Sequence, residues 1–236
     1  MSSDLRPPPR AAAFREGLAA VEPALLAIHG WRLSRQPRGD GRPVIVLPGF
    51  GAGDISTIPL RRYLRSLGHD ARGWRLGQNG GDVQALHGVM LDRVAAIVEH
   101  HGAAIPLIGW SLGGVIAREV ARERPDLVEQ VITFGSPVIG GPKYTRVGSA
   151  YRARGVDLDA VEREVAGRDE RPITVPITAI YTKFDGVVAW QACIDTVSPH
   201  VEHIEVHTTH LGLGIHHEVF VIVAQRLHVD RAASDG

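Results

Sequence analysis

The sequence has little that would tie it to an oxidising compartment or to a nucleic acid. Its single cysteine, Cys193, excludes an internal disulfide and is expected to be a small buried hydrophobe. The 26 basic and 26 acidic residues cancel, so the chain has no global field that would attract nucleic acid or an anionic lipid surface. We therefore expect a small-molecule ligand and no nucleic-acid partner, while the oligomeric state stays open.

Long hydrophobic runs are also missing. The first ten residues are polar, and the stretch after them is interrupted by Arg15, Glu16, Glu22 and Pro23, which leaves no signal-peptide core. No other segment approaches the roughly 20 apolar residues that a membrane-spanning helix needs. The sequence thus predicts a cytoplasmic protein without stable membrane insertion.

Length and composition predict one domain. With 236 residues, 44% of them hydrophobic, the chain can bury one large core. Residues 1–9, which include three consecutive prolines, are expected to form a flexible leader, and residues 231–236 a flexible tail. Residues 10–230 form the predicted domain, in which the charged segment 140–172 is expected to be a small cap or lid.

Apolar residues with alternating strand-like and helix-like spacing predict an α/β fold. Continuous β-branched or apolar runs predict strands at 43–48, 69–76, 105–110, 128–134, 173–181 and 201–206. Helical spacing predicts helices at 11–28, 58–67, 83–101, 112–122 and 216–228. The first helix, which restarts near Pro23 and is expected to pack on the body, has its apolar repeat at Phe14, Leu18, Val21, Leu25 and Ile28. Such alternation implies a mostly parallel central sheet with helices on both faces.

The segment "PLIGWSLGGVIARE" (106–119) places Ser111 where a predicted strand turns directly into a helix. Gly109 and Gly113 remove side chains that would collide at so sharp a bend. The bend lifts the serine hydroxyl above the sheet edge and sets it at a helix N-terminus, near the N–H of Leu112. The pattern alone is also compatible with an ordinary turn and a capping serine. Its strand and helix context favours a nucleophile.

A second donor for an oxyanion is expected in the loop "LPGFGAGD", which follows the predicted strand 43–48. The N–H of Phe50 is the first candidate, and that of Gly51 the second. A plain glycine turn is the alternative interpretation of this loop.

A base and an orienting acid are expected after the late strands. Asp185 follows the strand ending near Tyr181, and Asp195 is the reserve acid; Asp-Gly is also an ordinary turn dipeptide. His210 follows the last predicted strand. Its loop position distinguishes it from other nearby histidines, which lie on or at the end of a strand or open a helix: His203, His207, His216 and His217.

No metal site or cofactor is predicted. His203 and His207 would lie about 13 Å apart in an extended strand, too far to share one ion. The glycine-rich stretch 49–53 lacks the frame of a dinucleotide-binding loop and the lysine of a phosphate-binding loop.

Six segments together resemble the α/β-hydrolase superfamily, and most of all its bacterial esterase/lipase-like members. They are "VIVLPGFGAGD", "GWRLGQNGGD", "LIGWSLGGVIARE", "ITFGSPVIG", "IYTKFDGVV" and "HLGLG", and the resemblance covers about residues 43–227. It implies a catalytic triad of Ser111 as nucleophile, His210 as base and Asp185 as orienting acid. It also implies oxyanion donors at Phe50 and Leu112, an acyl-enzyme intermediate, an ester substrate and no cofactor.

The sequence departs from this family in two places. The oxyanion loop reads Pro-Gly-Phe instead of the His-Gly-Gly-Gly of some esterases, and the cap is short and charged. The narrow apolar stripe of the cap predicts a helix packed on the body more than a mobile lid; it consists of Leu158, Val161 and Val165. We therefore expect short to medium acyl chains.

Alternative functions with the same residues stay open. An acyltransferase or a thioesterase would use the same triad, and a non-catalytic binding protein would keep only the fold. Trp74 and Asn79 lie in a glycine-rich loop that either walls the ligand crevice or packs on the surface. Trp110, beside the serine, is expected to pack in the core.

Overall fold

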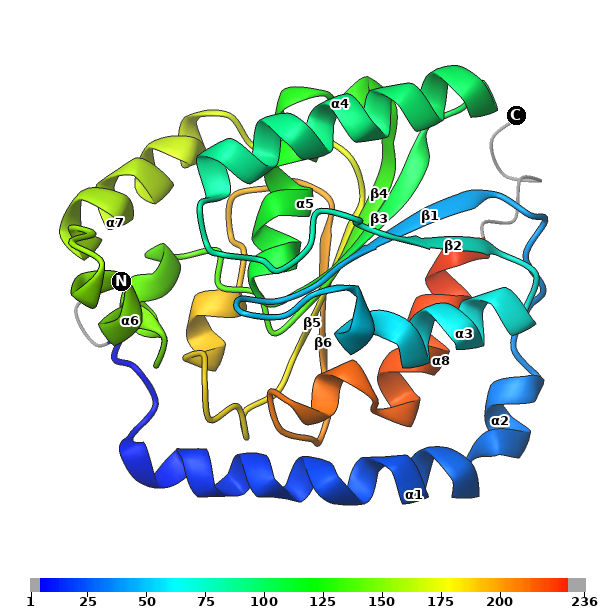
Figure 1. Cartoon of the computed structure of the whole chain (residues 1–236), viewed down its shortest axis with the longest axis horizontal. Coiled ribbons are helices and arrows are strands. Elements are labelled where there is room, and N and C mark those ends of the chain that lie inside the picture. Colours follow the sequence, from blue (N-terminus) through cyan, green and yellow to red (C-terminus); the bar gives the residue numbers. More distant parts are fainter. Residues whose placement is uncertain (1–4, 229–236) are drawn as a thin grey trace.

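Residues 5–228 are described in a computed structural model, and they form one six-stranded parallel sheet with the strand order β2-β1-β3-β4-β5-β6 (Figure 1). The strands are β1 (Pro43–Leu47), β2 (Asp70–Gly73), β3 (Ile105–Trp110), β4 (Val128–Phe134), β5 (Ile177–Tyr181) and β6 (Val201–Glu205). The predicted α/β architecture is confirmed. Because β1 lies between β2 and β3, the strand order reverses here, and such reversal points form ligand crevices at the carboxyl ends of strands. Residues 1–4 and the predicted tail lie outside the described residues.

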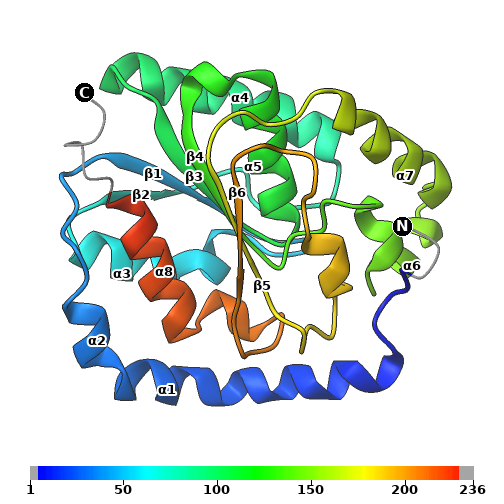
Figure 2. The same ribbon diagram turned by 180° about the vertical axis from the view of Figure 1, so that it is seen from behind.

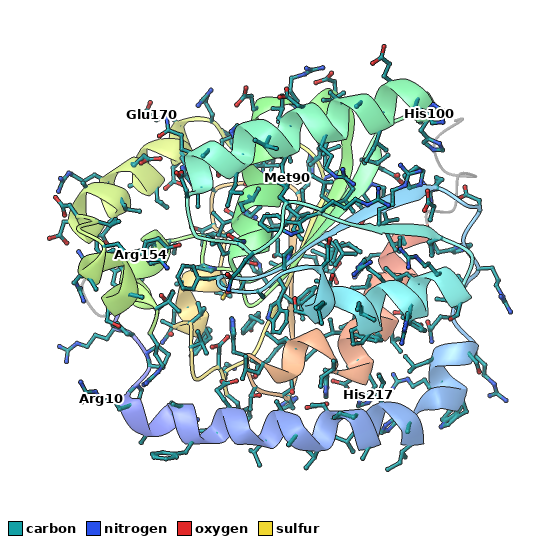
Figure 3. All side chains as sticks on the ribbon, viewed as in Figure 1. Arg10, Met90, His100, Arg154, Glu170 and His217 are labelled. Carbon is teal, nitrogen blue, oxygen red and sulfur yellow. The ribbon has the colours of Figure 1, made fainter. Side chains whose placement is uncertain are left out.

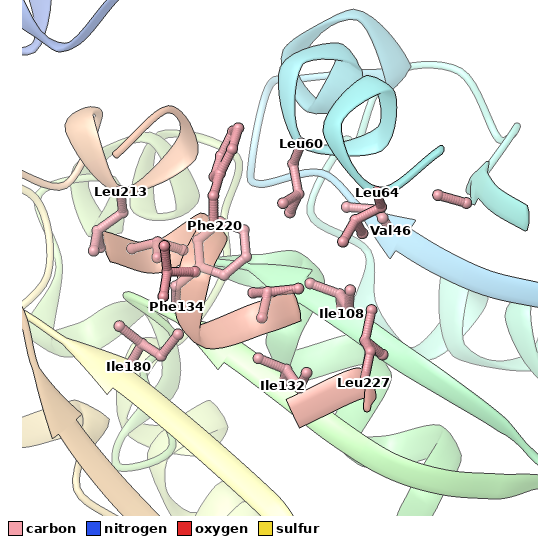
Figure 4. Packing of buried hydrophobic residues seen from close by; sticks show 14 of the residues in the cluster. Val46, Leu60, Leu64, Ile108, Ile132, Phe134, Ile180, Leu213, Phe220 and Leu227 are labelled. Atoms are coloured by element: carbon pink, nitrogen blue, oxygen red, sulfur yellow. The ribbon is translucent and has the colours of Figure 1, made fainter. Parts of the chain in front are cut away.

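Helices cover both faces of the sheet. One face packs against α3 (Ile58–Ser66) and α8 (His217–Leu227), and the other against α4 (Val83–His101) and α5 (Leu112–Glu123) (Figures 1 and 2). Strand β1 shows why both faces are apolar: alternate residues enter opposite cores, Val44 and Val46 on one side, Ile45 and Leu47 on the other. Figure 4 shows the first core around Phe134 and Phe220, and Figure 3 shows Met90, which belongs to the second.

Local signals set several helix boundaries where the sequence predicts them. The Asp82 carboxylate accepts a hydrogen bond from Ala85 N at 3.0 Å and caps the start of α4. Gly102, with φ of 83°, ends the same helix, and Gly68, with φ of 101°, follows α3. These two glycines adopt the left-handed conformation that other residues tolerate poorly.

Two predicted strands are shorter in the structure, because side chains or proline remove backbone groups from the ladder. Strand β2 stops at Gly73, since the N–H groups of Trp74 and Arg75 donate to the Asp54 carboxylate at 2.9 and 3.1 Å. Strand β5 begins only at Ile177, because Pro176 has no N–H to donate.

The N-terminal segment consists of η1 (Arg10–Val21), a 3₁₀ helix, followed by α1 (Glu22–Ile28) and α2 (Gly30–Ser34). It restarts at Pro23, which lies in the first turn of α1, as the sequence predicts. It lies along the outer edge of the molecule (Figures 1 and 2). The segment contacts the body as expected but through an unexpected face: Ala12, Glu16 and Glu22 are buried, while most of the predicted apolar repeat is exposed. The carboxylates tolerate burial because each has hydrogen-bond donors on the body.

The segment after β4 forms small helices: η4 (Gly141–Tyr144), α6 (Gly148–Ala153), α7 (Leu158–Gly167) and η5 (Arg168–Glu170). We call residues 141–170 the cap. Leu158 is buried, and the Lys143 ammonium bridges Asp159 and Glu162 of α7 at 2.6 and 2.5 Å. The remaining short helices are η2 (Asp54–Thr57), η3 (Pro125–Leu127), η6 (Trp190–Cys193) and η7 (Gly212–Gly214).

Cys193 is a free, buried cysteine, as the sequence predicts, and burial raises the pKa of its thiol well above the ordinary value. Among residues 5–228, no helix is both long enough and apolar enough to span a bilayer.

Candidate active site

Ser111 occupies a strained turn between β3 and α5. Its backbone has φ of 52° and ψ of −120°, a region that non-glycine residues rarely adopt. Ser111 N donates to Phe134 O on β4 at 2.9 Å, which fixes the turn to the sheet. A side chain at Gly109 would overlap the backbone of α5, and one at Gly113 would overlap the Leu47 carbonyl. The two glycines that the sequence analysis singled out are therefore sterically required.

Asp185 and His210 meet at the carboxyl edge of the sheet, although they follow different strands. His210 Nδ1 lies 2.7 Å from Asp185 Oδ2, and both residues are buried. The second carboxylate oxygen, Asp185 Oδ1, accepts hydrogen bonds from Val187 N at 2.8 Å and from Val188 N at 2.6 Å. With Nδ1 bound to the carboxylate, Nε2 is the imidazole nitrogen left for a reacting group.

The imidazole is electrostatically tuned by its surroundings. Burial alone lowers the pKa of His210, but the negative charge of Asp185, their hydrogen bond and the charge of Glu16 outweigh it. The net result is a pKa above the ordinary value of 6.5. This environment stabilises an imidazolium when it forms.

Asp195, the reserve acid, is engaged elsewhere. Its Oδ2 forms an ion pair with Arg118, and both side chains are buried. Its Oδ1 accepts hydrogen bonds from Val197 N at 2.8 Å and Ser198 N at 3.0 Å. Burial raises the pKa of this carboxyl, but Arg118 and these N–H groups outweigh burial and hold the pKa well below its usual range. Asp195 thus joins η6 to α5, and it is Asp185 that contacts His210.

The other nearby histidines also have separate partners. His216 Nδ1 lies 2.7 Å from Glu22 Oε2, and the His217 ring stacks on His29 with 3.8 Å between centroids. His203 Nε2 accepts a hydrogen bond from Asp195 N at 3.0 Å, whereas the His207 ring lies beside Phe184.

The loop after β1 brings Phe50 close to Ser111. A Cβ placed on Gly49 would lie 3.3 Å from Ser111 Cβ, so the chain here runs against the serine. Gly51 N donates to Asn79 O at 2.8 Å and is therefore occupied. Within residues 5–228, the N–H groups of Phe50 and Leu112 make no hydrogen bond. Of the candidate donors, these two are free to bind an oxyanion.

A cavity of about 710 Å³ lies between the sheet edge and the cap. Ser111, His210, Phe50 and Leu112 all line it, whereas Asp185 lies behind His210. No hydrogen bond joins Ser111 Oγ to His210 in the part of the chain that the structure describes. Such bonds often shorten only when substrate binds. The other lining residues are mostly apolar and include Trp110, Val115, Val147, Tyr151, Val156, Val161, Val165 and Val188.

The cap rests on the candidate oxyanion loop. Tyr151 of α6 donates a hydrogen bond to Gly81 O at 3.2 Å, and its ring lies 5.2 Å from that of Phe50. Arg154 donates to Gly80 O at 2.7 Å, and its guanidinium lies over the Phe50 ring at 5.3 Å. The apolar stripe of the cap packs as predicted at Leu158, while Val161 and Val165 line the cavity. The cap therefore shapes the cavity next to Ser111.

The structure distinguishes the roles of Trp74, Asn79 and Trp110. Trp74 is buried in the core behind the sheet, and neither it nor Asn79 lines the cavity. Asn79 instead donates from Nδ2 to Pro48 O at 2.9 Å and so supports the oxyanion loop. Trp110 packs beside Phe134, as expected, and also lines the cavity.

Two residues near the site were missed by sequence reasoning. Tyr151 carries no motif, because its role depends on how the cap folds back. Glu16, which binds the histidine loop, was treated only as an interruption of an apolar stretch. No local signal marks this role, because the donors to Glu16 lie at residues 186, 210 and 211.

Comparisons with known proteins bear on the fold and on the kind of relatives that the chain has. No family model matches the chain. The pimeloyl-(acyl-carrier protein) methyl ester esterase of Vibrio cholerae serotype O1 is 26% identical over 136 residues, which are 56% of this chain and 47% of that protein. The chain thus matches about half the length of this curated relative.

Solved structures resemble the chain over most of its length. A metagenome-derived lipolytic enzyme from a study of LipS and LipT has a TM-score of 0.60 at 14% identity, covering 81% of this chain and 94% of that one. The thioesterase domain from the curacin biosynthetic pathway has a TM-score of 0.55 at 12% identity, covering 82% and 91%. The chain has the α/β-hydrolase fold. Its likeness is to esterase- and lipase-type members of that superfamily.

Proposed function

We propose that this chain is a serine hydrolase that cleaves carboxylic esters through an acyl-enzyme on Ser111. One observation carries the proposal: a serine in a strained strand-to-helix turn shares a cavity with a histidine that is hydrogen-bonded to a buried aspartate. The similarity to an esterase over part of the chain supports the same class of reaction.

In the proposed reaction, Ser111 Oγ attacks the ester carbonyl carbon while its proton passes to His210 Nε2. The carbonyl oxygen becomes an oxyanion, which the N–H groups of Phe50 and Leu112 stabilise. The carbon–oxygen bond to the alcohol then breaks, and the imidazolium returns the proton to the leaving alcohol. Water, activated by the same imidazole, hydrolyses the acyl-enzyme. Asp185 holds the ring and stabilises its protonated form throughout.

The cavity supports an ester with a short to medium acyl chain. Its volume of about 710 Å³ and its apolar cap residues suit an aliphatic acid or a small aromatic one. The similar Vibrio protein acts, by its name, on a methyl ester, which supports a small alcohol as the leaving group here.

Thioester cleavage is a second candidate, favoured by the structural likeness to a thioesterase domain. The acyl-enzyme is the same, and only the leaving atom differs. Paired assays of an ester and a thioester with the same acyl group separate the two functions, and product analysis with added alcohol detects acyl transfer.

The deciding experiment is labelling with a fluorophosphonate probe, followed by peptide mapping. We expect modification of Ser111, hydrolysis of p-nitrophenyl acetate or butyrate, and loss of both in Ser111→Ala by at least about a thousandfold in rate. Ser66→Ala, which alters an exposed serine on α3, is the matched control and should behave as wild type. A folded protein that is neither labelled nor active would leave only the binding-protein interpretation.

A further inference from the structure

The Glu16 carboxylate binds the two loops that carry the candidate acid and base. Glu16 Oε1 accepts hydrogen bonds from Gly186 N at 2.7 Å and His210 N at 3.2 Å, and Oε2 accepts one from Leu211 N at 2.7 Å. Gly186 directly follows Asp185, so one side chain spans both loops. Glu16 does not line the cavity and would not touch a substrate.

The Glu16 carboxylate lies close to His210 and raises the pKa of its imidazole. Three N–H donors compensate for its burial, and no ion pair within residues 5–228 involves Glu16. The groups that face the imidazole are Asp185, from the loop after β5, and Glu16, from η1. Cys193 on η6 lies near Asp185 as a buried thiol, and Ser111 faces the cavity side. The imidazole therefore faces two negative charges and no positive one among these groups.

We propose that Glu16 is a positioning residue that ties the Asp185 loop to the His210 loop and stabilises the imidazolium. The inference rests on the proposed serine hydrolase function. The effect of Glu16 on His210 can be tested separately from that function. Glu16 positions the His210 loop and stabilises the imidazolium whether or not an ester is the substrate.

Glu22 supplies a matched control on the same segment. Glu22 is also buried, but it binds the Thr208 hydroxyl and the His216 imidazole. It accepts no hydrogen bond from the backbone of Gly186, His210 or Leu211 among the described residues. Replacing either acid removes one buried carboxylate from the N-terminal segment. Only Glu16 replacement removes contacts to the candidate catalytic pair.

The test compares Glu16→Gln, Glu16→Ala and Glu22→Gln. Gln keeps one oxygen acceptor but loses the charge, so we expect kcat to fall by about tenfold or more, with little change in KM. The pH midpoint of kcat should move to lower pH, because less negative charge stabilises the imidazolium. Glu16→Ala should lower kcat further than Glu16→Gln does. Glu22→Gln should lower the melting temperature without moving the pH midpoint of kcat.

An NMR titration of His210, made in the Ser111→Ala background and assigned with His210→Ala, gives a readout independent of turnover. The pKa of His210 should fall in Glu16→Gln and stay constant in Glu22→Gln. An unchanged titration, or equal shifts in both variants, would overturn the positioning role. If the titration shifts but fluorophosphonate never labels Ser111, the proposed function fails while the role of Glu16 stands.

A different observation concerns the outward side of the same segment. Phe14 is 87% exposed, Ile28 67% and Trp31 60%. We call these three side chains, together with Leu18 and Val21, the outer stripe. It belongs to η1, α1 and α2, which lie at the edge of the molecule in both views (Figures 1 and 2).

The exposed charged side chains on this segment are of one sign. Residues 5–38 contain six arginines, all exposed and none in an ion pair within the described chain: Arg6, Arg10, Arg15, Arg32, Arg35 and Arg38. Figure 3 shows Arg10 at the start of the segment. The only acids in this range, Glu16 and Glu22, are buried and bonded. The neutral net charge of the chain therefore conceals a local basic surface.

We infer that the outer stripe adsorbs to an anionic lipid surface, with its apolar side chains at the headgroup boundary and its arginines near phosphates. A second copy of the chain fits this face less well, because stripe-to-stripe contact would bring two sets of unpaired arginines together. The adsorption needs no spanning helix.

Vesicle cosedimentation tests this inference. The full chain should bind phosphatidylcholine vesicles containing 30% phosphatidylglycerol, release at high salt, and bind pure phosphatidylcholine weakly. Phe14→Ser with Trp31→Ser, or Arg15→Glu with Arg32→Glu, should each lower partitioning by about tenfold or more. Phe184→Ser, at an exposed aromatic outside the segment, should have no effect. The inference is overturned if the full chain does not bind the anionic vesicles, or if both double variants bind them as well as wild type does. It is also overturned if the chain forms a dimer in solution that the double variants dissociate.

Discussion

His210 Nδ1 lies 2.7 Å from Asp185 Oδ2, and the two residues are only 4% and 7% exposed. In such an environment, a hydrogen bond between an imidazole and a carboxylate fixes the ring orientation and its tautomer. Two backbone N–H groups donate to the other carboxylate oxygen of Asp185 and fix its orientation. The fixed carboxylate in turn orients the His210 imidazole. The proposed chemistry depends on this pair.

The first prediction separates the two candidate acids. Asp185→Asn should lower kcat/KM by at least about a hundredfold with a modest change in stability, because Asn no longer stabilises an imidazolium. Asp195→Asn should instead destabilise the fold by about 3 kcal/mol, since it leaves Arg118 buried without its anion, while the activity of the folded protein remains. Kinetics and chemical denaturation measure both. A larger catalytic loss in Asp195→Asn would show that the acid is misassigned.

The second prediction concerns pH. Only a neutral imidazole accepts the serine proton, so the rate should rise as His210 loses its proton. Because the pKa of His210 is raised in the fold, the midpoint should lie above the value of about 6.5 expected from the sequence. A pH profile of kcat/KM for p-nitrophenyl butyrate checks this. A rate that is flat from mildly acidic to alkaline pH would contradict the assigned base.

The third prediction tests the strained turn. Gly109→Ala would drive a methyl group into the backbone of α5 at Gly114, and we expect a loss of about 3 kcal/mol in unfolding free energy together with lost activity. Gly88→Ala in α4 is the matched control, because nothing lies within 4 Å of a Cβ there. That substitution should stabilise the protein by about 0.5–1 kcal/mol. Chemical denaturation of both variants measures their free energies of unfolding. Equal effects in the two variants would mean that the turn tolerates a side chain at position 109.

The fourth prediction tests the cap as the wall of the acyl site. Val161→Trp adds bulk inside the cavity, so kcat/KM for p-nitrophenyl octanoate should fall by about tenfold relative to the acetate. Val89→Trp, on the exposed side of α4, leaves the cavity unaltered and should keep the wild-type preference. An unchanged chain-length profile in Val161→Trp would place the acyl group elsewhere.

Much of the fold follows from the sequence because its signals are local. The run 43–47 is apolar at every position, as a strand buried on both faces requires, and Asp82 and Gly102 mark both ends of α4. Ser111 was recognisable for the same reason: the strand, the bend and the helix are contiguous. Asp185 and His210 were predicted as partners from their order after the late strands, and the structure brings them into contact because parallel strands have their carboxyl ends at one edge.

What the sequence left undetermined depends on non-local partners. Nothing around Glu16 indicates that its carboxylate enters the body, because its donors lie at residues 186, 210 and 211. The apolar repeat beginning at Phe14 therefore suggested the wrong buried face. Tyr151 likewise acquires its contact with Phe50 only when the cap folds over the loop after β1.

The bonds from Glu16 join η1 to loops that lie 170 and 194 residues further along the chain. During synthesis, the N-terminal helix leaves the ribosome long before residues 186 and 210 exist, and its carboxylate must wait in water for them. A chain that ends shortly before His210 lacks the candidate base and two of the three amides that Glu16 binds, those of His210 and Leu211. The candidate acid and base therefore become tied to η1 only after residue 211 has been made.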